Sequence, residues 1–355
     1  MMKLTDREWR PFAINTLFER FTPGKCSAVT HLEKSEYGIE YIGATNHNNG
    51  VLCYLAENEE NLKLVQDGNC IGFIKDGDGS AGYAIYKRES FVSTVNVIYG
   101  YASWLNSLTG LFFVGAQDMI KHKYSHGYKR NMQHLKADHV MLPADDNGQP
   151  DYQFMADYER QVIRHKREQY LKYVSDQLAK LGSIEPLKPL DELKWNPVCV
   201  ADIGNVLSGH DIYARERIDG QIPYVTSGST NNGIGYFVGN DNKSKDFGVI
   251  SVNRNGAVGE AFYHPYTALF GNDCRKLRLD LDEKHKYAPF FIAAMISKQK
   301  TAFSYSRKLG TARLKLLKVM LPVNNQGQPD YDYMEQYIKN KMIQKYKKYL
   351  EYLGK

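Results

Sequence analysis

Short runs of β-branched and aromatic residues occupy most of residues 1–143 and return in residues 186–322. Runs such as FVSTVNVIYG (91–100) and GVISV (248–252) have the composition of strands, and the glycines and asparagines between such runs favour turns. Each stretch ends in a polar turn that leads into a long segment without a helix breaker. The pattern predicts two β-rich modules, each followed by a long helix.

The two predicted helices run from Met155 to Leu181 and from Met334 to Leu353, after a Pro-Asp pair in which Asp151 or Asp330 can cap the helix. Apolar positions spaced by seven and four indicate a coiled-coil seam. We therefore expect the helices to pack antiparallel, which would relate the two halves by a pseudo-two-fold axis. The candidate packing residues are Ile163, Tyr170, Val174, Met342, Tyr349 and Leu353.

The chain is an internal duplication. LPADDNGQPDYQFMADY (142–158) returns as LPVNNQGQPDYDYMEQY (321–337), 179 positions later (321 − 142). A looser upstream alignment pairs Gly79 with Gly256 and sets Arg254 opposite Gly77. The expected organisation is a first domain at 1–143, a turn and helix at 144–185, a second domain at 186–322, and a C-terminal turn and helix at 323–355, with a proline-containing linker at 182–197.

Composition, cysteine spacing and net charge limit the classes of protein to which the chain can belong. The 355 residues are 43% hydrophobic and 24% charged, without an apolar run long enough to span a membrane, so we expect a cytoplasmic globular protein with no membrane partner. The five cysteines never form a C-x-x-C pair, which argues against a disulfide framework or a zinc site. The net charge of +6 is compatible with a polyanionic partner.

Three motifs that resemble cofactor, metal or nuclease sites have simpler interpretations. GDGSAG (77–82) matches a dinucleotide-binding loop, but strand-like residues follow it, so we expect a hairpin turn. His122 and His126 have a metal-ligand spacing, but the surrounding lysines would repel a cation. Asp282 and Lys284 match a nuclease D-x-K only in a charged surface stretch. We expect no catalytic residues, no metal and no cofactor in this chain.

Basic residues interleaved with hydroxyl, amide and aromatic side chains occupy equivalent places in the two halves, at 121–136 and 300–315. Lysine and arginine can neutralise phosphates, and the other side chains can read base edges, so we expect double-stranded DNA as a partner. A polar surface loop is the alternative for any single residue. The candidates in the first half are Thr45, Asn46, His47, Asn48, Lys75, Asp78, Ser80, Lys121, Lys123, Tyr124, Ser125, His126, Tyr128, Lys129 and Arg130. Those in the second half are Thr226, Ser227, Ser229, Thr230, Asn231, Asn253, Arg254, Asn255, Ser304, Tyr305, Ser306, Arg307, Lys308, Thr311 and Arg313.

The chain resembles the DNA-specificity subunits of type I restriction-modification enzymes, and more closely the short specificity subunits of type IIB-like enzymes. The resemblance rests on a set of short motifs, on their order along the chain and on their duplication. The resemblance covers essentially the whole chain. The motifs are EWRPF (8–12), IGATN (42–46), KWNP (194–197), YVTSGSTNNG (224–233), NRNGAVGEAFY (253–263), RLKLLKVMLP (313–322) and GQPDYDYMEQYI (327–338).

The resemblance implies an α+β fold of two target recognition domains in tandem pseudo-repeat. Each would read one half of a bipartite, asymmetric DNA site, and the paired helices would act as a ruler between them. A helix of about 25 residues is about 38 Å long, close to the ~34–36 Å between successive major grooves on one DNA face. The chain would direct two adenine methyltransferase subunits, and a restriction subunit as a further candidate, with S-adenosylmethionine and Mg in those partners.

Two other functions stay open at this point. A stand-alone nuclease or methyltransferase would need catalytic motifs that the sequence does not contain, such as the [ND]-P-P-[FYW] motif of DNA amino-methyltransferases. A repeat scaffold that binds only proteins would show no salt-sensitive DNA binding. Both alternatives predict results that differ from those of a DNA-specificity subunit.

Overall fold

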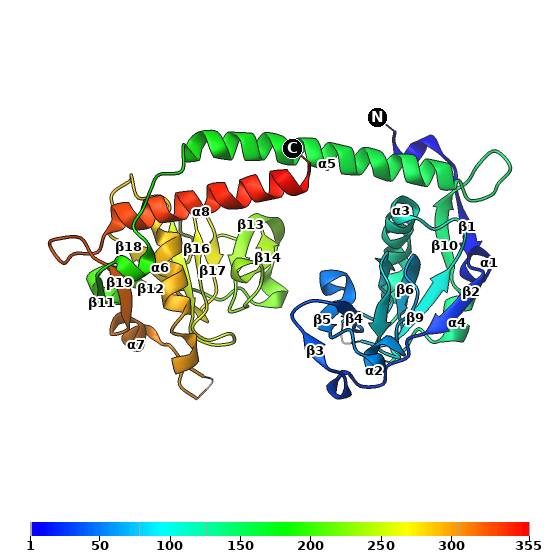
Figure 1. The fold of residues 1–355 in the computed structure, drawn as a ribbon, viewed down its shortest axis with the longest axis horizontal. Helices are drawn as coiled ribbons and strands as arrows, with labels where there is room; N and C mark the ends of the chain where they lie inside the picture. Colours follow the sequence, from blue (N-terminus) through cyan, green and yellow to red (C-terminus); the bar gives the residue numbers. More distant parts are fainter. Residues whose placement is uncertain (1, 78, 126, 305, 355) are drawn as a thin grey trace. The chain divides into compact units, whose positions relative to one another are not determined.

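The computed structural model describes all residues except 1, 78, 126, 305 and 355, and it divides into two compact units, residues 1–172 and 173–355. Figure 1 shows strands and short helices in each unit and the long helices α5 (Tyr152–Leu181) and α8 (Tyr331–Tyr352). None of the helices in the described part of the chain combines the length and apolarity needed to cross a bilayer.

The first unit contains two four-stranded sheets and a two-stranded ribbon among its described residues. The strand orders are β2-β9-β6-β7, which is antiparallel throughout, and β3-β5-β4-β8, in which β4 and β8 are parallel. The strands are β1 (Trp9–Ala13), β2 (Arg20–Pro23), β3 (Lys34–Ser35), β4 (Ile39–Ile42), β5 (Val51–Leu55), β6 (Cys70–Ile74), β7 (Ala84–Lys87), β8 (Phe91–Ser93), β9 (Val97–Tyr101) and β10 (His139–Pro143). The shorter helices are α1 (Ile14–Leu17), α2 (Glu59–Leu62), α3 (Ser107–Gln117) and α4 (Met132–Ala137), with 3-10 turns at Leu4–Asp6, Val29–His31, His47–Gly50 and Asp118–Lys123.

The second unit repeats this plan. Its sheets have the orders β12-β18-β15-β16 and β14-β13-β17, and a ribbon pairs β11 with β19 as β1 pairs with β10. The strands are β11 (Trp195–Cys199), β12 (Gly204–Ser208), β13 (Asp219–Val225), β14 (Ile234–Val238), β15 (Val249–Asn253), β16 (Ala261–His264), β17 (Leu269–Phe270), β18 (Cys274–Leu279) and β19 (Lys318–Pro322). The shorter helices are α6 (Ala288–Ser297) and α7 (Thr311–Lys315), with 3-10 turns at Leu190–Glu192, Val200–Asp202, Ala214–Glu216, Asn231–Gly233 and Lys300–Ala302.

In each unit, a cluster of three aromatic rings joins the two-stranded ribbon, the helix α3 or α6, and the long helix. In the first unit Phe112 of α3 stacks on Trp9, with ring centroids 5.9 Å apart, and meets Tyr158 of α5 edge-on at 5.7 Å. The second unit repeats both contacts, at 6.2 and 5.5 Å, with Trp195, Phe291 and Tyr337. Aromatic pairs of this kind add about 0.5–1.5 kcal/mol beyond the area they bury, so the repeated sequence preserves a repeated core.

The N-terminal caps of the long helices confirm a prediction from the sequence. The side chain of Asp151 accepts a hydrogen bond from the backbone N–H of Phe154 at 2.8 Å, and that of Asp330 accepts one from Tyr333 at 2.9 Å. Helices α5 and α8 begin three residues earlier than predicted, at Tyr152 and Tyr331. The predicted linker ends earlier than residue 197, because Trp195 already pairs with β19.

The end of α5 packs against α8 inside the second unit. The hydroxyls of Tyr173 and Tyr346 lie 3.4 Å apart, and Val174 is buried. Glu185, which follows the end of α5, accepts a hydrogen bond at its carbonyl oxygen from the side-chain amide of Asn340 in α8, at 2.7 Å. These contacts fix the last residues of α5 on the second unit.

A buried histidine in the second unit predicts a pH-dependent stability. His264 on β16 lies with Nε2 2.8 Å from the Ser251 hydroxyl, and burial lowers the pKa of His264 to about 4. The unfolded chain, with a histidine pKa of about 6.5, binds the proton first as pH falls, so stability is lost between about pH 6.5 and 4. We expect the unfolding free energy of this unit to fall by about 2 kcal/mol from pH 7 to pH 5.

Pulsed hydrogen exchange of β15 and β16 peptides across a urea series, with the pulse at one fixed pH, measures this change. The His264→Gln variant should lose the pH dependence, and the variant of an exposed histidine in the same unit, His210→Gln, should keep it. An identical pH dependence in the native chain and His264→Gln would show that another group is responsible.

Candidate nucleic-acid interface

Three loops meet at one end of the first unit. The Ser80 hydroxyl donates to the Asn46 side-chain oxygen at 2.9 Å, and the Lys129 ammonium lies 2.6 Å from the Asp76 carboxylate. These bonds link the three loops directly. The loops are residues 43–50 between β4 and β5, residues 75–83 between β6 and β7, and residues 118–131 between α3 and α4.

The equivalent three loops meet in the second unit. The backbone N–H of Ala257 donates to the Ser227 carbonyl at 3.1 Å, and the Lys300 ammonium lies 2.7 Å from the Glu260 carboxylate. The sequence therefore places the same loop arrangement on both units, with different side chains. The loops are residues 226–233, 254–260 and 298–310.

The glycine-rich hairpin loops match in backbone conformation. Gly82 and Gly259 have φ values of +87° and +84°, which favour glycine. A Cβ on Gly82 would lie 2.6 Å from the Lys121 carbonyl oxygen, and one on Gly259 would lie 2.9 Å from the Lys300 Cα. The predicted hairpin turn is confirmed, because each loop joins two antiparallel strands.

The structure corrects the alignment of Arg254. Lys75 is the first residue after strand β6, and Arg254 is the first residue after strand β15. Their backbone N–H groups donate to the residue that precedes the neighbouring strand, Lys75 to the Asn96 carbonyl at 2.9 Å and Arg254 to the Asp273 carbonyl at 2.8 Å. Arg254 is therefore the counterpart of Lys75 and not of Gly77, and the extra residues of the first hairpin loop follow Lys75.

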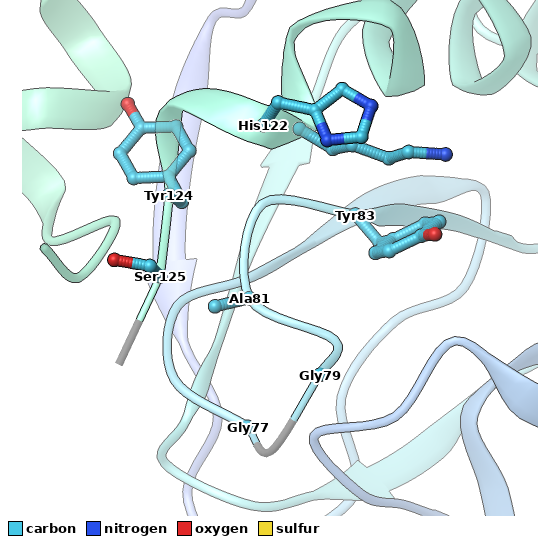
Figure 2. Close-up of a pocket in the computed structure, with 8 residues that line it drawn as sticks. Gly77, Gly79, Ala81, Tyr83, His122, Tyr124 and Ser125 are labelled. Atoms are coloured by element: carbon cyan, nitrogen blue, oxygen red, sulfur yellow. The ribbon is translucent and has the colours of Figure 1, made fainter. Parts of the chain in front are cut away.

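A cavity of about 460 Å³ lies between two of the loops in the first unit. Figure 2 shows the glycine-rich turn, with Gly77 and Gly79, on one side and the segment carrying His122 to Ser125 on the other. The Lys121 ammonium lies 4.5 Å from the centroid of the Tyr83 ring, within reach of a cation–π contact. The cavity offers a cation, hydroxyls and backbone groups to a polar ligand.

Arg130 was wrongly predicted to face DNA. Its side chain is 0% exposed, and Nη1 donates to the Gly82 carbonyl at 3.1 Å and to the Gln117 side-chain oxygen at 2.8 Å. Nη2 lies 3.2 Å from the Asp138 carboxylate. Burial lowers the pKa of Arg130. The guanidinium stands beneath the loops and ties them together.

Three further candidates are buried, which is incompatible with direct contact to DNA. The Tyr124 hydroxyl donates to the Asp138 carboxylate at 2.5 Å, and burial, with that hydrogen bond, raises the pKa of Tyr124. Ser80 holds Asn46, and the Asn253 amide donates to the Gly228 carbonyl at 2.9 Å. Their polar atoms form hydrogen bonds within the unit to which each belongs, and a buried polar group without such a partner would cost stability.

The remaining candidates are exposed or half-buried on the loops. Those of the first unit are Thr45, Asn46, His47, Asn48, Lys75, Lys121, Lys123, Ser125, Tyr128 and Lys129. Those of the second unit are Thr226, Ser227, Ser229, Thr230, Asn231, Arg254, Asn255, Ser304, Ser306, Arg307, Lys308, Thr311 and Arg313. Asp78, His126 and Tyr305 lie outside the described residues.

Acidic residues were missed by the sequence reasoning. Asp76, Asp138, Glu260 and Asp273 each hold a lysine or arginine of the loops. Most of them lie far along the chain from their partners, so no local motif marks them. Across the described residues, no group of three or more His, Cys, Asp or Glu side chains is placed to hold a metal ion.

The candidate helix-packing residues differ in exposure. Val174 is buried, Ile163 and Tyr349 are 45% and 44% exposed, and the others are half-buried. Their joint role in pairing the two helices stays a prediction.

Comparison with known proteins identifies the family. The family model described as type I restriction modification DNA specificity domain matches residues 6–172 and 192–352. The specificity subunit S.BcgI of the type II restriction enzyme BgcI from Heyndrickxia coagulans is 27% identical over 340 residues, which cover 95% of this chain and 96% of the relative. The crystal structure of a type I restriction-modification S subunit from M. genitalium shares the fold, with a TM-score of 0.50, 17% identity and coverage of 99% of this chain and 94% of that one. The chain therefore belongs to the family of type I restriction modification DNA specificity domains and contains two such domains in tandem.

Proposed function

We propose that this chain is the non-catalytic subunit that selects the DNA site of a restriction-modification enzyme. Each unit reads one half of a bipartite, asymmetric site with its three loops. The observation that carries this proposal is the recurrence of one loop arrangement with different exposed side chains in the two units. The same scaffold with different side chains suits two readers of two different words.

A small hairpin within the loops illustrates this recurrence. Ser125 and Tyr128 exchange backbone hydrogen bonds of 3.2 and 3.0 Å, and Ser304 and Arg307 exchange equivalent bonds of 3.4 and 3.0 Å. The paired residues make the same backbone hydrogen bonds, but a phenol in one unit replaces a guanidinium in the other. Arginine favours guanine or phosphate, whereas a tyrosine hydroxyl can donate to or accept from a base edge or a phosphate.

The methyltransferase and cleavage chemistry belongs to partner subunits in this proposal. The relative from Heyndrickxia coagulans is named as one subunit of a restriction enzyme, which supports the same division of labour here. We propose that two adenine methyltransferase subunits bind the chain, one for each tandem domain, and supply S-adenosylmethionine. A restriction subunit or a fused nuclease would supply Mg-dependent cleavage.

Salt-dependent DNA binding by the purified full chain tests the DNA-reading role. We expect the logarithm of the affinity to fall linearly with the logarithm of salt concentration, because lysines and arginines displace counterions from phosphates. Neutralising Lys129 and Arg307 together (Lys129→Gln, Arg307→Gln) should weaken binding and reduce the slope by up to about 0.9 for each lost phosphate contact.

Neutralising the exposed lysine that directly follows α2 (Lys63→Gln) controls for net charge, and we expect it to change neither quantity. Fluorescence anisotropy with a labelled duplex measures both. Binding that is absent, or that does not change with salt, would favour the protein-only scaffold.

A further inference from the structure

Arg254 is held by a carboxylate at the start of the second hairpin loop. Its Nη2 donates to Asp273 Oδ1 at 3.0 Å, in addition to the backbone bond to the Asp273 carbonyl. The other carboxylate oxygen, Oδ2, lies 3.4 Å from the side-chain amide of Asn255. One edge of the guanidinium is therefore fixed by a side chain that is itself held from a second direction.

Other donors of this guanidinium are unused. Nε is buried without a hydrogen-bond partner, whereas the side chain as a whole is 29% exposed. Within the described part of the chain, Nη1 makes no hydrogen bond, and Nη2 uses one of its two hydrogens on Asp273. At least one hydrogen on each terminal nitrogen therefore remains for an incoming ligand.

The equivalent cation of the first unit is arranged differently. The Lys75 ammonium donates to the Val95 carbonyl at 3.1 Å, and Asn96 stands where the second unit has Asp273. Lysine is a point charge without a planar fork, and asparagine cannot hold a cation by charge. The carboxylate-held fork is therefore a property of the second unit.

Resting on the DNA-reading role proposed above, we propose that Arg254 reads a guanine in the half-site of the second unit. Asp273 is the positioning residue in this account. Arginine recognises guanine through two parallel hydrogen bonds to O6 and N7 in the major groove, and that geometry needs two donors in a fixed plane. A carboxylate that holds the fork before binding reduces the side-chain freedom lost on contact.

Two simpler roles for the Arg254–Asp273 pair make different predictions. As a surface ion pair it would contribute little to stability and nothing to sequence choice. As a phosphate contact, Arg254 would raise the affinity for every sequence equally. Only the guanine-reading role links Arg254 to a single base pair.

The test uses the full chain and duplexes that carry its mapped site or one substituted base pair in the half-site of the second unit. Competition binding compares the native chain with Arg254→Lys and Asp273→Asn. The matched control is Arg278→Lys, because Arg278 also pairs with a carboxylate, that of Asp246, but lies on β18 outside the three loops.

We expect the native chain to discriminate at one G·C pair by roughly 5- to 150-fold, the range for a bidentate contact. Arg254→Lys should lose most of this discrimination at that pair alone, Asp273→Asn should lose part of it, and Arg278→Lys should keep it. Unchanged discrimination at the other base pairs of the same half-site would show that the second unit of each variant is folded.

A uniform loss of affinity in Arg254→Lys, with discrimination preserved at every position, would overturn the guanine-reading role. Unchanged binding by Arg254→Lys at every duplex would overturn it as well. Failure of the DNA-reading function itself would appear differently, because the native chain would then bind all the duplexes equally.

Discussion

Removing the charge of Asp138 is expected to destabilise the first unit by about 3–5 kcal/mol, the usual cost of breaking a buried ion pair from one side. Asp138 is 1% exposed and accepts hydrogen bonds from Tyr124 and Lys123, and Arg130 lies against it with no exposed surface. In Asp138→Asn the buried guanidinium would lose its counter-charge, and burial already disfavours the charged form.

The second unit shows how the same core is built without charge. At the offset of 179 positions, Leu309 and Leu317 occupy the places of Arg130 and Asp138. Leu309 is fully buried. We expect a variant of the first unit with four substitutions to recover most of the stability lost in Asp138→Asn, because hydrophobic replacement of a complete buried ion pair is often neutral or stabilising. Its substitutions are Gln117→Ile, Tyr124→Phe, Arg130→Leu and Asp138→Leu.

Urea unfolding, read from pulsed hydrogen exchange of α3 and β10 peptides, measures these stabilities. The control is Asp76→Asn, which breaks an exposed pair with Lys129 and should cost at most about 1 kcal/mol. Equal stabilities of Asp138→Asn and Asp76→Asn would contradict the buried-network account.

Duplicating the first recognition module is expected to replace the second half of the DNA site with a copy of the first half. The variant replaces residues 200–317 with a second copy of residues 14–138 and retains both ribbons and both long helices. The copy should fit, because Met334 and Tyr337 of α8 repeat Met155 and Tyr158 of α5, which pack on the first module. The proposed site of this variant contains the first word twice, once on each strand.

Local signals in the sequence explain which elements could be predicted. The Pro-Asp turns, the helix caps and the glycine-rich hairpin depend on residues a few positions apart, and the structure confirms them. Helices α3 and α6 were missed, and SLTGLFFVGAQ and APFFIAAMIS show why. They are apolar on nearly all sides, so they lack the 3.6-residue periodicity that distinguishes a helix from a buried strand.

The candidate site, like the fold, could be predicted from the sequence only in part. Clusters of polar residues marked the three loops of each unit, because such clusters favour turns and surfaces. The burial of Arg130 depends on Asp138, and the orientation of Arg254 depends on Asp273, which lies nineteen positions away from it. A cation in a polar stretch does not reveal whether it faces solvent or a carboxylate contributed by another element.

The most direct test of the central claim is a map of methylated adenines in cells that express the chain with the methyltransferase of its own system. Single-molecule sequencing of host DNA would be compared for the native chain and the variant with the duplicated module. The account predicts a motif split into two different words at a fixed gap for the native chain, and the first word repeated in inverted orientation at the same gap for the variant. An unsplit motif in the native chain, or the native motif unchanged in the variant, would contradict it.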